Sequence, residues 1–257
     1  MKQFLTCALL LIGLSASGQA IMNIFQNNGS LLQVPLSDID SITYSFLEYL
    51  NPGLTYGTVT DQNGNTYPTI VIGTQEWMAE NLRAATYSNG DPIMNLTDPV
   101  QWLDVLSTST GAWAHYENNP SYDMPYGKLY NGFVATDPRN VCPTGWHVPT
   151  YNEWTQLSNY LGGDGVSGGK LKSIGTVYWG SNNIGGTNES GFSALGGGIR
   201  SNSDGNFYLF LGQSNWWTST EITSLSAYIS AVGDNGPQLY RFSTDNNAGC
   251  FIRCLRD

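Results

Sequence analysis

Residues 142–154 read CPTGWHVPTYNEW, and this stretch holds the clearest structural signal in the sequence. Two prolines make its first half rigid and extended. Thr150 and Glu153 then have the spacing of a capping box, in which a hydroxyl and a carboxylate bind backbone N–H groups that the start of a helix leaves unpaired. Gly162 suits the left-handed position after a last helical turn. The stretch therefore predicts an extended segment leading into an amphipathic helix, whose apolar face carries Trp154, Leu157 and Leu161.

The composition is aromatic, rich in glycine and poor in charge. The 257 residues include 30 glycines, 12% aromatic residues and 12% charged residues, and the formal net charge is −10. Aromatic side chains at this share can form a sizeable core, which excludes a disordered chain. The acidic balance argues against a nucleic-acid partner, because nucleic acids are bound by basic surfaces. The many glycines favour turns and short strands over long helices.

The first 20 residues have the pattern of a secretory signal peptide. Lys2 precedes an apolar run at residues 4–14, and small residues follow as far as Ala20, where we expect cleavage. The run is too short to cross a bilayer as a helix, and no other segment resembles a membrane span. Small residues do not immediately precede Cys7, which argues against a lipid anchor on that cysteine. The sequence therefore predicts a secreted, extracellular or cell-surface protein without a membrane span in the mature chain.

Three cysteines lie beyond the expected cleavage point: Cys142, Cys250 and Cys254. An oxidising compartment favours a disulfide between two of them. In an extended segment Cys250 and Cys254 lie about 13 Å apart, which is beyond the reach of a disulfide. Any bridge therefore includes Cys142, and the spacing leaves its partner open.

Residues 21–50 form a short β-rich N-terminal extension. Residues 31–36 and 38–44 have strand-like patterns, and Asn27-Asn28-Gly29 is a turn signal. The extension is too small to hold a core of its own, so it is either a docked hairpin or a segment that needs a partner. A proline–glycine break follows, and we assign residues 51–257 to one main domain.

The sequence DQNGN at residues 61–65 separates two strand-like runs, 58–60 and 66–72. An Asn-Gly pair between such runs predicts a β-hairpin. Calcium loops begin in a similar way, but the twelfth position here is Ile72 instead of glutamate. The motif therefore indicates a turn and not a calcium site.

Two glycine motifs overlap after the predicted helix. Residues 163–168 match G-x-G-x-x-G and residues 165–169 match G-x-S-x-G. Dinucleotide binding and a nucleophile elbow both need a strand before the glycines, and here a helix precedes them. We expect a flexible loop. His115 and His147 lack metal-ligand spacing, and His147 fits a structural hydrogen-bonding role. We predict no catalytic residue, no metal and no cofactor.

Aromatic and asparagine side chains are interleaved along the last third of the chain. Flat rings stack on sugar faces and amides bind hydroxyls, and the same mixture also binds protein surfaces. In the pair Trp216-Trp217, strand alternation predicts one buried and one exposed ring. The candidate ligand-binding residues are Trp179, Asn182, Tyr208, Trp216, Asn235, Tyr240 and Asn246.

Residues 67–257 resemble the Fibrobacter succinogenes major paralogous domain. Six motifs carry the resemblance in order: IGTQEWMAENL at 72–82, GKLYN at 127–131, CPTGWHVPT with EW at 142–154, TNESGFSALGGGIR at 187–200, WWTSTE at 216–221 and RCLRD at 253–257. This family is similar to the C-type-lectin-like and formylglycine-generating-enzyme-like superfamily. The resemblance implies an α+β, C-type-lectin-like or sulfatase-modifying-factor-like fold with short antiparallel strands, few helices and many loops. It also implies that the two ends of the module lie near each other.

The resemblance also carries expectations about chemistry. It implies a disulfide between Cys142 and Cys254, with Cys250 left as an odd thiol. Enzymes of the superfamily use copper-binding cysteines, and only Cys250 is spare here. Its calcium-dependent lectins use Glu-Pro-Asn or Gln-Pro-Asp with Trp-Asn-Asp, and these motifs do not occur in the sequence. Relatives that vary their ligand do so near the C-terminal strands, which correspond to residues 202–247.

The leading interpretation is a secreted or cell-surface, non-catalytic module that binds a glycan or a protein at the cell exterior. Its C-terminal aromatic and asparagine-rich loops would make the contact. One alternative is an extracellular enzyme, a metal-dependent oxidase or a hydrolase, whose site no motif reveals. Another is a structural component of an envelope or fibre assembly, in which the N-terminal extension donates a strand to a neighbour.

Overall fold

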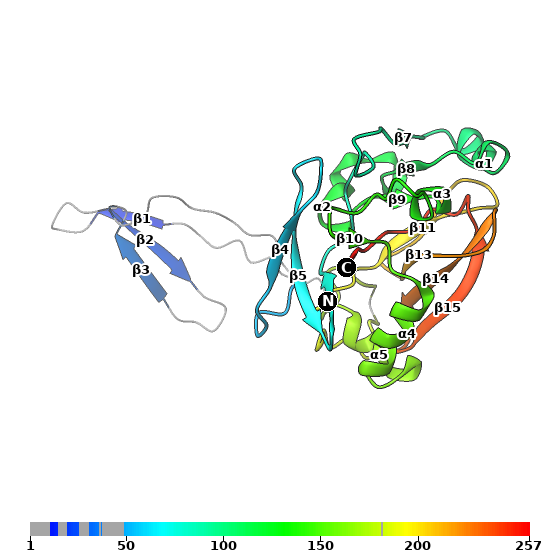
Figure 1. Cartoon of the computed structure of the whole chain (residues 1–257). Coiled ribbons are helices and arrows are strands. Elements are labelled where there is room, and N and C mark those ends of the chain that lie inside the picture. Colours follow the sequence, from blue (N-terminus) through cyan, green and yellow to red (C-terminus); the bar gives the residue numbers. More distant parts are fainter. Residues whose placement is uncertain (1–10, 15–19, 26–30, 36, 38–48, 181) are drawn as a thin grey trace. The chain divides into compact units, whose positions relative to one another are not determined.

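A computed structural model describes residues 11–14, 20–25, 31–35, 37, 49–180 and 182–257 (Figure 1). The chain divides into two compact units, Met1–Phe46 and Leu47–Asp257. In the first unit, three strands form an antiparallel sheet in the order β1-β2-β3. These strands are β1 (Leu11–Leu14), β2 (Ala20–Phe25) and β3 (Leu31–Pro35).

Two sequence predictions concern the first unit: the strands of the N-terminal extension and the signal peptide. Strand β3 is present where residues 31–36 predict a strand. The second predicted strand, residues 38–44, and the turn signal at 27–29 lie outside the described residues. Strand β1 falls within the segment with the signal-peptide pattern, and cleavage near Ala20 stays a prediction.

The second unit begins with an antiparallel sheet in the order β10-β16-β6-β5-β4. Because β4 comes first in this unit and β16 comes last, the two ends of the module meet in one sheet, as the resemblance implies. The strands are β4 (Gly57–Thr60), β5 (Thr66–Ile72), β6 (Gln75–Met78), β10 (Trp146–His147) and β16 (Leu255–Arg256).

The predicted hairpin around residues 61–65 is confirmed. Strands β4 and β5 pair in antiparallel register on either side of it. The Asp61 carboxylate accepts hydrogen bonds from the backbone N–H groups of Asn63 and Asn65, both at 2.9 Å, and from the Tyr67 hydroxyl at 2.6 Å. Asp61 therefore organises the turn, which is the structural role that an Asx turn gives to aspartate.

Short elements connect this sheet to the rest of the unit. They are β7 (Met94–Asn95), α1 (Pro99–Thr108), β8 (Ala112–Ala114), η2 (Tyr116–Asn118), η3 (Pro120–Tyr122), α2 (Asp123–Tyr126), β9 (Leu129–Tyr130) and α3 (Gly132–Ala135). Helix α1 was not predicted from the sequence. Its start carries a local signal, however, because the Asp98 carboxylate accepts from the N–H groups of Val100 and Gln101 and Pro99 occupies the first turn.

The predicted capping-box helix is confirmed as α4 (Tyr151–Tyr160). The Thr150 hydroxyl accepts from the Glu153 N–H, and the Glu153 carboxylate accepts from the Thr150 N–H at 2.7 Å. Gly162 follows with a φ of +101°. Trp154, Leu157 and Leu161 are buried, as their spacing predicts.

The expected flexible loop at residues 163–169 is wrong, because Gly163 is the N-cap of helix α5 (Asp164–Leu171) and the residues after it are helical. Gly168 and Gly169 are buried against the chain that enters strand β15. A Cβ atom on Gly168 would lie 2.1 Å from the carbonyl oxygen of Gln238, and the Gly169 N–H donates to the carbonyl of Pro237. Glycine is a poor helix former, but here it permits a close backbone contact, and this tertiary packing outweighs the local preference.

The C-terminal sheet carries the remaining strands in the order β12-β11-β13-β14-β15. Strands β11 and β13 are parallel, and the other pairs are antiparallel. Helices α4 and α5 pack against β13, β14 and β15 (Figure 1). The strands are β11 (Gly197–Arg200), β12 (Phe207–Phe210), β13 (Gln213–Thr223), β14 (Ser226–Gly233) and β15 (Leu239–Asp245).

The side chains of Trp216 and Trp217 are both fully buried, so the prediction that one ring would be exposed is wrong. Alternation along β13 does send the two rings to opposite faces. On the helix side, the Trp216 ring lies 5.6 Å from that of Trp154, and its Nε1 donates to Asn81. On the other side, Trp217 Nε1 donates to the carbonyl of Tyr130 at 2.8 Å. Both faces are covered at this point, so alternation does not lead to exposure.

Cys142 and Cys254 form a disulfide with a Cα–Cα distance of 5.9 Å, as the family resemblance implies. The bridge ties the segment before α4 to the segment before β16. Cys250 is a free cysteine and is buried. Within the described part of the chain, no helix is both long enough and apolar enough to cross a membrane.

Candidate functional site

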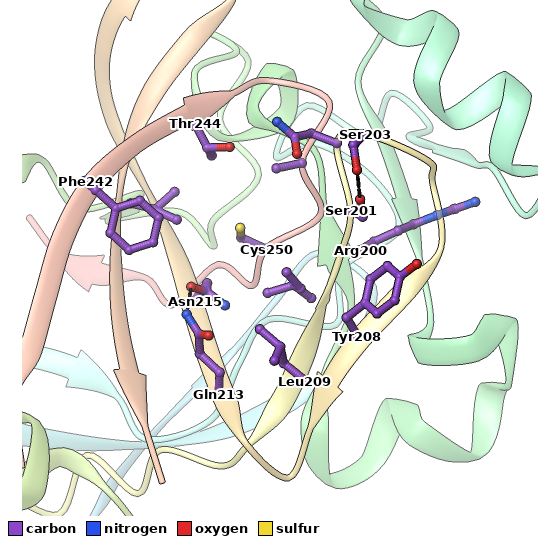
Figure 2. A pocket seen from close by; sticks show the side chains of 14 residues that line it. Arg200, Ser201, Ser203, Tyr208, Leu209, Gln213, Asn215, Phe242, Thr244 and Cys250 are labelled. Atoms are coloured by element: carbon purple, nitrogen blue, oxygen red, sulfur yellow. Dashed lines mark hydrogen bonds between the residues drawn. The ribbon is translucent and has the colours of Figure 1, made fainter. Parts of the chain in front are cut away.

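The candidate site is a pocket of about 480 Å³ on the C-terminal sheet (Figure 2). Strands β11 to β15 and the segment after β15 contribute its walls. Figure 2 shows Phe242 and Thr244 on one side, Tyr208 and Leu209 on the other, and Cys250 between them. The lining residues are Ile199, Arg200, Ser201, Asn202, Ser203, Tyr208, Leu209, Gln213, Asn215, Ile229, Phe242, Thr244, Ala248 and Cys250.

The register of the sheet explains why these side chains share one face. Ile229 on β14 is paired with Phe242 on β15, and its other neighbour is Trp217 on β13. Residues two apart on a strand share a face, so Gln213 and Asn215 lie on the same side as Trp217. Arg241 points the opposite way, toward α5, where its guanidinium pairs with Asp164 at 2.5 Å. The helices therefore cover one face of this sheet, and the pocket lies on the other.

The apolar part of the pocket is aliphatic and aromatic. Ile229, Ala248 and Cys250 are buried, whereas the side chains of Tyr208 and Phe242 are 46% and 44% exposed. Burial raises the pKa of the Cys250 thiol well above its usual range. At neutral pH this group is therefore a protonated, weakly polar wall and not a thiolate nucleophile.

The polar part of the pocket is uncharged. Arg200 is the one lining residue with a cationic side chain, and Figure 2 shows that side chain directed away from the pocket. Its guanidinium donates to the carbonyls of Leu96, Thr97 and Gly205 and lies 4.2 Å from the Trp102 ring. Among the described lining residues, none is Asp, Glu, Lys or His. The pocket therefore offers amides, hydroxyls and apolar surface.

Asn215 is a buried polar lining residue that the fold leaves incompletely paired. Its side-chain oxygen accepts from Gln213 Nε2 at 2.9 Å. Its amide nitrogen has no hydrogen-bond partner among the residues that the structure describes, although Asn215 is only 2% exposed. A buried donor without a partner costs about 1–3 kcal/mol, so this nitrogen is suited to an acceptor that a ligand supplies.

The pocket includes only one of the ligand-binding residues that were predicted from the sequence. Tyr208 lines it, and Asn235 and Tyr240 line a neighbouring pocket of about 270 Å³ that shares Leu209 and Gln213. Asn182 is exposed and lines neither pocket. The remaining candidates, Trp179, Trp216 and Asn246, are buried in the protein interior.

The sequence patterns did not indicate three of the residues that line the pocket: Phe242, Gln213 and Asn215. The alternation of β15 holds a signal for Phe242, because Tyr240 and Phe242 are two residues apart on one face. Asn215 has no such signal, since it precedes two tryptophans in a strand that is largely buried. Whether Asn215 lines a pocket depends on which face of the sheet the helices leave uncovered.

The predicted structural role of His147 is confirmed. Its Nδ1 lies 2.6 Å from the Asp257 carboxylate, and its Nε2 lies 3.0 Å from that of Glu153. The hydrogen bond to Glu153, together with that to Asp257, raises the pKa of His147. At His115, burial lowers the pKa. Over the described residues, no three His, Cys, Asp or Glu side chains are grouped so that they could hold a metal ion.

Fold and site define a disulfide-closed α+β module with two five-stranded sheets and a neutral pocket on the C-terminal sheet. The model of the Fibrobacter succinogenes major domain family matches residues 70–256, and the chain belongs to this family. The comparisons with curated proteins and with solved structures gave no match.

Proposed function

We propose that this protein is a non-catalytic binding module that holds a neutral sugar unit of a glycan in the pocket of its C-terminal sheet. The observation that carries the proposal is the combination, in one pocket of about 480 Å³, of exposed rings, aliphatic floor, amides and hydroxyls without a charged side chain facing inward. Pockets of this size accept small ligands.

The lining chemistry favours a glycan over the alternatives. A sugar has an apolar ring face that stacks on Tyr208 or Phe242 and hydroxyls that bind amides such as Gln213. A hydrolase would need acids or bases at the reacting bond, and the described lining residues supply none. A protein partner would need a wider contact surface with a core of anchor residues, and this pocket does not provide such a surface.

The cell exterior is the proposed location. The signal-peptide pattern in residues 1–20 supports export, and the disulfide between Cys142 and Cys254 is a bond that oxidising compartments favour. A C-type-lectin-like fold is part of the same proposal, supported by the family's resemblance to that superfamily and by the shared sheet at the ends of the module.

The test is a neutral-glycan array probed with the full chain as secreted, followed by titration of the best ligand. Phe242→Ala and Tyr208→Ala should each weaken binding about tenfold, because each removes a stacking ring worth about 1.4 kcal/mol. Tyr160→Ala is the matched control, since Tyr160 is 66% exposed on α4 and lies outside the pocket. An array without binding, or equal losses in all three variants, would refute the proposal.

A further inference from the structure

We infer that the pocket selects a 2-acetamido sugar, a unit whose amide carbonyl accepts a hydrogen bond from Asn215 and whose methyl group contacts the apolar floor. This inference rests on the proposed function and adds the chemical class of the ligand. Three features of the pocket carry it: an unpaired donor, an aliphatic floor and the lack of a charge to pair with a cationic ligand.

The unpaired donor identifies an acceptor on the ligand. Asn215 Nδ2 lacks a partner within the described chain, whereas the oxygen of the same amide is already engaged by Gln213. The site therefore has a vacant donor and needs a carbonyl-type acceptor. Sugar hydroxyls can accept, but an amide oxygen is the stronger acceptor and projects further from the ring.

The floor next to this donor fits a methyl group. Ile199, Ile229, Ala248 and Cys250 line the same pocket, and burial keeps the Cys250 thiol protonated. An acetamido group places a carbonyl and a methyl on the same carbon. One substituent can therefore satisfy the Asn215 donor and fill aliphatic space, which a hydroxyl at the same ring position cannot do.

The absence of charge discriminates against the deacetylated sugar. A free amino sugar is a cation in mildly acidic solution. The described lining residues include no carboxylate that could pair with it, and the Asp204 carboxylate next to the lining residue Tyr208 already accepts a hydrogen bond from the Tyr208 hydroxyl at 2.6 Å. Moving an unpaired ammonium group into this pocket is unfavourable. Acetylation removes the charge, so the same sugar with and without its acetyl group should bind very differently.

The experiment compares three trimers of matched size with the full chain: chitotriose, cellotriose and the fully deacetylated glucosamine trimer. We expect chitotriose to bind at least tenfold more tightly than either of the others by calorimetry. In saturation-transfer NMR, the acetyl methyl protons should receive the strongest transfer. Cellotriose binding as tightly as chitotriose would overturn the inference.

The variant Asn215→Leu separates a ligand contact from a structural role. Leucine has a similar shape but lacks both the donor and the oxygen that accepts from Gln213, whose partly exposed amide can bind water instead. We therefore expect at least a tenfold loss of chitotriose affinity with little change in the melting temperature. Ser230→Ala is the matched control: its hydroxyl is also buried without a partner in the described chain, but the cross-strand partners of Ser230 are Trp216 and Arg241 of the helix-covered face. This control should retain full affinity.

The two proposals fail in different ways. If no neutral glycan binds and Phe242→Ala changes nothing, the proposed function itself is wrong. If glycans bind and Phe242→Ala weakens all of them, but chitotriose has no advantage and Asn215→Leu has no effect, only the acetamido inference is wrong. The trimer comparison uses the unmodified chain, so its outcome does not depend on whether a variant folds.

Discussion

Replacing Gly168 by alanine should destabilise the protein, whereas the same change at Gly165, in the same helix, should stabilise it. Both residues lie in α5. Glycine in a helix interior is less favourable than alanine by about 0.5–1 kcal/mol, so this gain applies at Gly168 and is an upper bound at Gly165, the second residue of the helix. What differs is the space around the new methyl group.

At Gly165 a Cβ atom would meet nothing within 4 Å, and a gain of up to about 0.5–1 kcal/mol should appear. At Gly168 it would lie 2.1 Å from the Gln238 carbonyl oxygen and 2.9 Å from the Leu239 nitrogen. These are backbone atoms at the start of β15, which cannot rotate aside. Overpacking costs about 1–3 kcal/mol, which exceeds the helix gain, so a net loss of up to about 2.5 kcal/mol remains.

Urea denaturation of the two variants and the parent measures both effects. The midpoint should rise for Gly165→Ala and fall for Gly168→Ala, with unchanged slopes. If residues 163–169 formed a flexible loop, both substitutions would act mainly on the unfolded chain and would shift the midpoint in the same direction. Shifts of equal sign would therefore refute the packing of α5 on β15.

Two further predictions concern the disulfide and His147. Replacing both Cys142 and Cys254 by serine should lower the free energy of unfolding, measured by urea denaturation, by about 5 kcal/mol. The reason is that the bridge spans 112 residues, for which the chain-entropy relation gives this value. A loss below about 1.5 kcal/mol would mean that the bridge barely restricts the unfolded chain. The pKa of His147 is raised in the folded state, so its stabilising effect is complete below about pH 6.5 and is lost as the pH rises through the folded-state pKa. The stability advantage of the parent over His147→Gln should therefore shrink between pH 5 and pH 9, and a constant difference would contradict the ionic role.

Local signals in the sequence determined the elements whose stabilising contacts lie a few residues apart. The capping box at Thr150 and the turn at Asp61 bind backbone groups within four residues, so their geometry is encoded in short spacings. The Cys142–Cys254 pairing came from the family resemblance, since spacing alone left the partner of Cys142 open. Family membership followed from ordered motifs and needed no coordinates.

The tertiary structure alone decided which surfaces are exposed. Trp216 and Trp217 follow the strand alternation that the sequence predicts, yet both are buried because helices cover one face of β13 and the core around Tyr130 covers the other. Gly168 is helical because β15 packs against it. Asn215 lines a pocket because the helices cover the other face of its sheet. In each case burial depends on the elements that pack over a residue, and these come from distant parts of the chain.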